Sequence, residues 1–91
     1  MLQTVSITIK GRVQGVYYRQ STKQKALELA ITGIVANRPD GSVQVVATGT
    51  SEQLERLADW CRHGPPKAIV TEIQAKELPL QLFDHFTIER F

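Results

Sequence analysis

The sequence lacks the features that mark disulfide-bonded, membrane-spanning and nucleic-acid-binding proteins. Its 91 residues include a single cysteine, so no disulfide can form within the chain. Acidic and basic residues are mixed and sum to a net charge of only +2, without the basic block of a nucleic-acid-binding protein. No apolar run approaches the ~18 residues of a membrane helix, and no basic segment precedes an apolar one at the N-terminus. We therefore expect a cytoplasmic protein without a nucleic-acid or membrane partner.

Potential metal ligands are equally sparse. His63 lies at the C-terminus of a predicted helix, where an imidazolium suits the helix dipole, and His85 has no partner at metal-binding spacing. We therefore expect neither histidine to bind a metal, and we expect no cofactor. Cys61 lies on the apolar side of a predicted helix, which favours a buried and unreactive thiol. A chain of this length supports one hydrophobic core, so we expect a single domain over residues 1–91 and a monomer.

Alternation of apolar and polar residues predicts five strands. The first carries Val5, Ile7 and Ile9 and is interrupted by a segment with two glycines, residues 11–15. The others are expected around residues 34–37, 43–47, 69–75 and 86–88. Residues 38–41, RPDG, place Pro, Asp and Gly where a tight turn favours them, so the second and third strands should form a hairpin.

Two helices complete the pattern. The first is expected over residues 21–32, with Ser21 and Gln24 as a capping box and Gly33 as its C-terminal stop. The second is expected to start near Thr50, with Thr50 and Gln53 as a second capping box and apolar residues at the spacing of one buried face. The order predicts a ferredoxin-like βαββαβ sandwich of the α+β class: an antiparallel sheet, two helices on one face and a short extra C-terminal strand. In that topology the first two strands run parallel, with the third between them.

The segment between the first strand and the first helix is a candidate anion site. Residues 11–19, GRVQGVYYR, contain glycines that allow successive backbone N–H groups to converge on one point. The N-terminus of the following helix adds unpaired N–H donors. Arg19 is unfavourable beside that positive helix end unless an anion binds there, and its planar guanidinium suits a phosphate. The alternative interpretation is an arginine that extends into water.

Asn37 becomes a candidate through its position in the predicted sheet. The first two strands end at the same sheet edge, two strand spacings or roughly 10 Å apart. Arg19 and Asn37 can therefore both point into the gap between them. An asparagine beside a turn more often serves local backbone hydrogen bonds, so the placement opposite the loop carries this hypothesis.

Two segments resemble the signatures of the acylphosphatase family. They are residues 11–19, GRVQGVYYR, and residues 33–37, GIVAN, and the likeness runs through nearly the whole chain. Tyr18 and Ile34 depart from the residues that the family commonly has at these positions, and neither carries the chemistry. The resemblance implies an enzyme that hydrolyses the carboxyl–phosphate bond of a small acyl phosphate by in-line attack of water.

The resemblance also implies roles for particular residues, without a metal. Arg19 would bind the phosphoryl oxygens and Asn37 would position the attacking water. The backbone N–H groups that would surround the phosphate, here called the phosphate cradle, belong to Gln14, Gly15, Val16, Tyr17, Tyr18 and Arg19.

Two other functions stay open at this point. One is a non-catalytic phosphate- or anion-binding module on the same fold. The other is an RNA-binding domain, which should carry aromatic residues on the exposed face of its third strand. The corresponding positions here are Ser42, Gln44, Val46 and Thr48, so the sequence gives little support to RNA binding.

Overall fold

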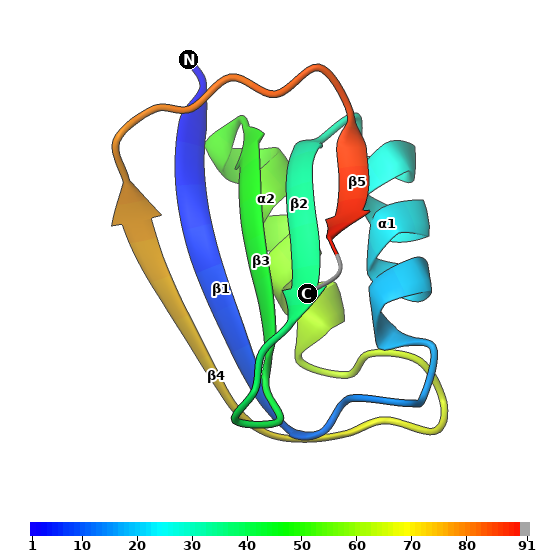
Figure 1. Ribbon diagram of the computed structural model, residues 1–91. Coiled ribbons are helices and arrows are strands. Elements are labelled where there is room, and N and C mark those ends of the chain that lie inside the picture. The colour runs from blue at the N-terminus through cyan, green and yellow to red at the C-terminus, as the bar shows by residue number, and fades with distance from the viewer. Residues whose placement is uncertain (90–91) are drawn as a thin grey trace.

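A five-stranded sheet with two helices on one face forms the architecture of the chain (Figure 1). The computed structural model describes residues 1–89. The elements, in chain order, are β1 (Gln3–Arg12), α1 (Tyr18–Glu28), β2 (Thr32–Asn37), β3 (Val43–Gly49), α2 (Ser51–Cys61), β4 (Ile69–Leu78) and β5 (Phe86–Glu89). The predicted ferredoxin-like α+β sandwich with a short extra strand is confirmed.

The sheet has the strand order β4-β1-β3-β2-β5. Strand β3 pairs antiparallel with both β1 and β2, so β1 and β2 run parallel as predicted. Strand β5 departs from the expected antiparallel sheet, because it pairs parallel with β2 through the register Gly33 to Phe86. The reason is the connection after β4, which crosses the end of the sheet before the chain turns back along its far edge (Figure 1).

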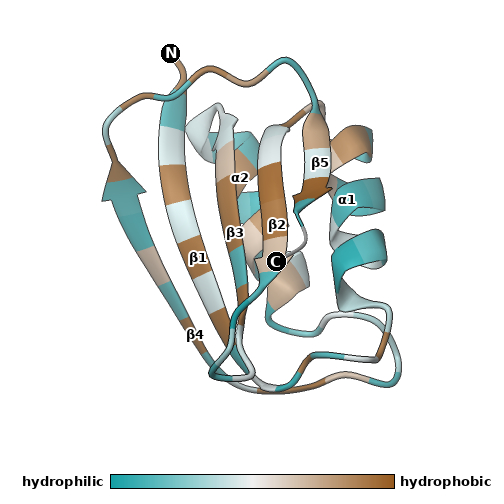
Figure 2. Ribbon diagram, in the orientation of Figure 1, coloured by the Kyte–Doolittle hydropathy of each residue, from teal (hydrophilic) through white to brown (hydrophobic). Residues whose placement is uncertain are grey.

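Helix α2 follows its local sequence signals closely. Thr50 and Gln53 form the predicted capping box, with the Gln53 N–H donating to Thr50 Oγ1 over 3.2 Å and the Thr50 N–H donating to Gln53 Oε1 over 2.8 Å. Leu54, Leu57 and Cys61 are buried at helical spacing against the sheet. Figure 2 shows apolar residues gathered on β1, β3 and β2, and α2 packs on β1 and β3 of this layer.

Helix α1 begins three residues earlier than its sequence predicts, at Tyr18 instead of Ser21. Its N-cap residue, Tyr17, has left-handed backbone geometry and makes no side-chain capping hydrogen bond. The expected capping box at Ser21 is therefore wrong. Burial of Tyr18 fixes this helix start, because the Tyr18 hydroxyl donates to the Cys61 carbonyl oxygen of α2 over 2.5 Å. Tertiary packing has overridden the local capping signal.

The C-terminal end of α1 also differs from the prediction. The helix stops at Glu28, and Gly33 lies inside β2 instead of ending the helix. A Cβ atom at Gly33, where φ is 149°, would lie 2.0 Å from the Val46 carbonyl oxygen of β3. Gly33 is thus required by the close approach of two strands, a contact that no helix-ending signal describes.

The connection over residues 79–85 is held to the end of the sheet by two threonines. Thr4 of β1 and Thr48 of β3 are buried, and their hydroxyl oxygens lie 2.6 Å apart. The Gln81 backbone completes the network, since its N–H donates to Thr4 Oγ1 over 2.9 Å and its carbonyl accepts from Thr48 Oγ1 over 2.6 Å. These bonds fix the path that delivers β5 to its place beside β2.

Candidate active site

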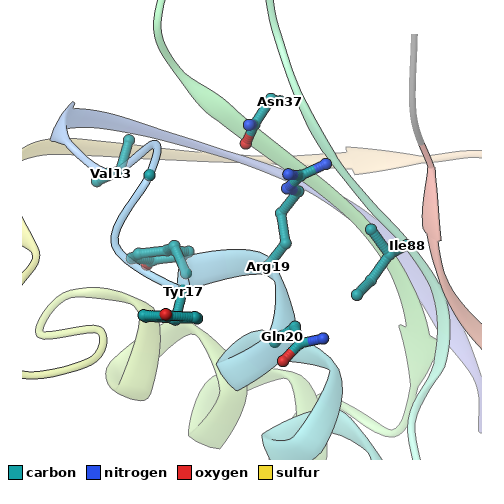
Figure 3. A pocket seen from close by; sticks show the side chains of 8 residues that line it. Val13, Tyr17, Arg19, Gln20, Asn37 and Ile88 are labelled. Carbon is teal, nitrogen blue, oxygen red and sulfur yellow. The ribbon is translucent and has the colours of Figure 1, made fainter.

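Arg19 and Asn37 line the same cavity, of about 400 Å³. Arg19 lies in the first turn of α1 and Asn37 is the last residue of β2. Figure 3 shows the Arg19 side chain extending from α1 toward Asn37, at the sheet edge where both were expected. The full lining consists of Val13, Gly15, Tyr17, Tyr18, Arg19, Gln20, Asn37 and Ile88.

The loop between β1 and α1 has the backbone geometry of an anion-binding turn. Gly15 has φ 74° and Tyr17 has φ 64°, two left-handed residues separated by one. Within the described part of the chain, the N–H groups of Gly15, Val16 and Tyr17 make no backbone hydrogen bond. Left-handed residues of this kind turn successive N–H groups toward one side, where they can converge on an anion. The first turn of α1 adds its own unpaired N–H donors.

Arg19 is available to bind an anion. The three ion pairs of the described residues all lie on helix surfaces, and none includes Arg19: they are Lys25–Glu28, Glu52–Arg56 and Asp59–Arg62. The first turn of α1 also carries no acidic residue, although a helix N-terminus favours one. The positive helix end and the guanidinium therefore act together on the same cavity.

Asn37 has a buried carboxamide oxygen without a hydrogen-bond partner. Oδ1 of Asn37 is the only buried side-chain nitrogen or oxygen atom in residues 1–89 with no partner in the chain. Such a group costs about 1–3 kcal/mol when it is left unpaired. Because the Asn37 side chain faces the cavity, a water molecule or ligand there is the natural donor to this oxygen (Figure 3).

Four of the six predicted cradle residues line the cavity and two do not. Gly15, Tyr17, Tyr18 and Arg19 line the cavity. Val16 is instead 8% exposed and belongs to the hydrophobic core. The Gln14 side chain turns away to the β2–β3 connection. The cradle prediction concerns the backbone N–H groups of this loop, and it stays a prediction.

Gln14 ties the loop to the turn that follows Asn37. Its Nε2 donates to the Arg38 carbonyl over 2.8 Å and to the Ser42 carbonyl over 2.9 Å. The predicted turn is present, since the Gly41 N–H donates to the Arg38 carbonyl over 3.1 Å. No periodic pattern in the sequence predicts these hydrogen bonds, because the partners of the Gln14 side-chain amide are backbone groups 24 and 28 residues away.

The turn itself is stabilised by Asp40. Its Oδ1 accepts hydrogen bonds from the Ser42 N–H and from the Ser42 hydroxyl. These bonds hold the pKa of the Asp40 carboxyl below its usual range. The turn therefore gives Gln14 fixed carbonyl groups to bind.

Three further cavity residues escaped the sequence analysis. Val13 and Gln20 flank the predicted cradle, and Gln20 could have been suspected because it follows Arg19 in the first helical turn. Ile88 comes from β5. No local pattern indicates that the last strand would pair with β2 and bring Ile88 to the cavity.

A packed layer beneath the loop supports the site. Tyr18 is 1% exposed and its ring lies 5.7 Å from that of Trp60, which is half-buried. Burial raises the pKa of the Tyr18 hydroxyl, so this group stays a neutral hydrogen-bond donor. Burial also raises the pKa of the Cys61 thiol to about 12, in agreement with the predicted unreactive thiol. The layer beneath the loop is thus packed and uncharged.

Residues 1–89 contain no group of three or more His, Cys, Asp and Glu side chains arranged to hold a metal ion. No helix within this described part of the chain has the length and the apolar character that crossing a membrane requires.

Comparison with known proteins agrees with this fold. The acylphosphatase family model matches residues 5–88. An acylphosphatase of Marinobacter nauticus is 55% identical over 80% of this chain and 79% of its own, and one of Methylococcus capsulatus is 48% identical over 85% and 84%. The crystal structure of acylphosphatase from Bacillus subtilis superposes with a TM-score of 0.93, with 33% identity over 98% of this chain and 99% of that one.

The chain therefore belongs to the acylphosphatase family. The family predicted from residues 11–19 and 33–37 is confirmed. The comparisons favour an acylphosphatase over the non-catalytic anion-binding module that the residues alone left open.

Proposed function

We propose that this acylphosphatase hydrolyses acyl phosphates by direct attack of water on a phosphoryl group that Arg19 binds, with Asn37 orienting the water. The observation that carries the proposal is the pairing of these two side chains in one cavity: an arginine outside every ion pair of the described residues and an unpaired buried carboxamide oxygen. The phosphoryl oxygens would lie among the N–H groups of residues 14–19 and the Arg19 guanidinium.

The reaction needs no general acid to protonate the leaving group. The leaving group is a carboxylate, whose conjugate acid has a pKa near ~4. It departs without protonation, which fits a cavity lined by no His, Asp, Glu or Lys side chain. The remaining tasks are to hold the phosphoryl group, stabilise the charge on its oxygens and align the nucleophile.

Asn37 suits the last of these tasks. Its Oδ1 would accept a hydrogen bond from the attacking water and place the water oxygen in line with the bond from phosphorus to the acyl oxygen. The new P–O bond forms as that bond breaks, and the electron pair leaves on the carboxylate. A carboxamide is too weak a base to take the proton, so the water proton passes to a phosphoryl oxygen, and the products are a carboxylate and inorganic phosphate.

Release of phosphate from acetyl phosphate in the presence of EDTA tests this proposal. Wild type should turn over at the same rate with and without the chelator, because no step requires a metal. Both Arg19→Ala and Asn37→Ala should lose about 100-fold or more in kcat/KM while staying folded, as judged by circular dichroism. Rapid turnover in either variant would remove that residue from the mechanism.

We also propose that the protein acts as a cytoplasmic monomer on small-molecule substrates. A complete cavity forms within one chain, and the one cysteine is buried without a disulfide. Light scattering during size-exclusion chromatography should give the 10.2 kDa mass of one chain. A stable dimer would contradict this part of the proposal.

A further inference from the structure

A groove continues from the cavity along α1. It has a volume of about 290 Å³ and shares Tyr17, Gln20 and Ile88 with the Arg19 cavity. Figure 3 shows Tyr17 and Ile88 on either side of Arg19, with Gln20 next to it on α1. Beyond them the groove runs past Lys23 and Gln24 to Leu27. We call it the α1–β5 groove.

Tyr17 stands at the junction between the cavity and the groove. Its side chain is 73% exposed although it is large and aromatic, and its backbone is left-handed with φ 64°. That backbone geometry is unfavourable for a bulky residue and is typical of functional sites. Neither feature helps the fold, because the ring packs on no part of the core. A ligand that passes from the cavity into the groove would cover this ring.

Leu27 provides a second exposed apolar side chain at the far end. It is 59% exposed on α1, eight residues after Arg19. Those eight residues span about 12 Å at the helical rise, roughly the distance from the phosphorus to the last carbon of an extended octanoyl phosphate. The groove thus begins where the phosphoryl group would bind and has apolar residues at both ends.

We infer that the α1–β5 groove binds the acyl group of the substrate, and that it fits an apolar chain of about six to eight carbons. The inference rests on the proposed function, because it takes the phosphoryl group to lie against Arg19. A chain attached there lies along Tyr17 and Ile88, passes the neutral amides of Gln20 and Gln24, and ends at Leu27.

Lys23 is the only charged residue along this path. Its side chain is half-buried, as expected if the aliphatic stem lines the groove and the ammonium group reaches water. It joins none of the three ion pairs of the described residues. A chain ending in a carboxylate is therefore the competing occupant, and the experiment separates the two chemistries.

The experiment measures kcat/KM for straight-chain acyl phosphates from acetyl to octanoyl, and for the six-carbon acyl phosphate with a terminal carboxylate. For wild type, kcat/KM should rise about two- to fourfold per methylene, since each methylene leaves water in the groove. The rise should end near eight carbons, where the groove ends. The carboxylate-terminated substrate should be slower than its apolar counterpart of equal length.

Variants locate the effect. Leu27→Ser should flatten the rise beyond six carbons, and its exposed position spares the fold. Tyr17→Asn keeps a residue that tolerates left-handed geometry but removes the ring, so the ratio of octanoyl to acetyl phosphate kcat/KM should fall at least fivefold. Tyr17→Phe should keep the wild-type ratio. Leu82→Ser, at a 76% exposed leucine outside the groove, is the matched control and should leave the whole series unchanged.

The outcomes separate this inference from the proposed function. Equal kcat/KM for all chain lengths, with acetyl phosphate still hydrolysed, would overturn the groove and leave the activity intact. Preference for the carboxylate-terminated chain, lost in Lys23→Ala, would overturn the apolar assignment. A chain-length rise that persists in both Leu27→Ser and Tyr17→Asn would place the acyl site elsewhere. Failure to hydrolyse any acyl phosphate would contradict the proposed function itself.

Discussion

Helices α1 and α2 each span 11 residues and pack side by side on one face of the sheet, yet their N-termini are built differently (Figure 1). Helix α2 has a complete capping box at Thr50 and an acidic residue, Glu52, in its first turn. Helix α1 starts from a left-handed tyrosine, with no side-chain cap and no acid in its first turn, and carries Arg19 there. Each feature that stabilises the first turn of α2 is missing from α1.

The difference identifies the helix end that serves function. A side-chain cap or a first-turn carboxylate on α1 would occupy the N–H groups that a phosphate needs, and would repel the phosphate's charge. The N-terminus of α1 is therefore stabilised from elsewhere, by the buried Tyr18 ring and its bond to α2. Proteins break local rules at functional sites and compensate through tertiary structure. Substitutions on the two helices should accordingly separate stability from activity.

The largest expected effect is on the stability of α2. Leu57 is fully buried, so Leu57→Ala should lower the free energy of unfolding by about 2–5 kcal/mol. Urea denaturation measures this change. The kcat/KM of the remaining folded enzyme should match wild type, and a large loss of activity per folded molecule would contradict the separation.

On α1 the corresponding change affects activity. Arg19→Lys keeps the charge but loses the planar, bidentate donors, so kcat/KM for acetyl phosphate should fall about 100-fold or more. The urea midpoint should stay near that of wild type, because Arg19 belongs to none of the ion pairs of residues 1–89. Full activity in this variant would show that only the charge of Arg19 matters.

Gln14 connects the two halves of the site, and its loss should have an intermediate effect. Gln14→Leu should lower kcat/KM about 10- to 100-fold, because the loop is no longer held to the turn after Asn37. Stability should change little, since the Arg38 and Ser42 carbonyls each keep another backbone partner, the N–H groups of Gly41 and Arg38 respectively. Steady-state kinetics with urea denaturation distinguishes this positioning role from unfolding.

The smallest effect compares the two helix starts directly. Thr50→Ala removes the capping box of α2 and should cost about 1 kcal/mol of stability. Ser21→Ala, at the cap that the sequence indicates for α1, should cost almost nothing because the helix already includes Ser21. Equal losses in the two variants, measured by thermal denaturation, would mean that Ser21 caps α1 in solution.

The sequence predicts the fold well where local rules hold. The strands, the RPDG turn and the cap of α2 all follow from periodicity and turn chemistry, and these elements have the βαββαβ order. Prediction from the sequence fails where contacts between residues far apart in the chain determine the local structure. Tyr18 sets the start of α1 through a hydrogen bond to Cys61, 43 residues away in the sequence. Gly33 is required because the backbone of the neighbouring strand β3 leaves no room for a Cβ atom.

The candidate site divides in the same way. Arg19 and Asn37 could be brought together from topology alone, because parallel strands end at one sheet edge. Topology alone could not predict three other features: the unpaired Oδ1 of Asn37, the hydrogen bonds of the Gln14 side-chain amide and the position of Ile88 in the cavity lining. Each depends on side-chain orientation or on the pairing of β5, which leave no periodic trace in the sequence.

The division of labour between Arg19 and Asn37 is the central claim, and titration with inorganic phosphate tests it most directly. Isothermal calorimetry on wild type, Arg19→Ala and Asn37→Ala would report binding without turnover. We expect Arg19→Ala to lose measurable phosphate binding. Asn37→Ala should bind phosphate with nearly wild-type affinity while turnover is abolished. Loss of phosphate binding in Asn37→Ala would contradict the account, because Asn37 would then hold the phosphate instead of the water.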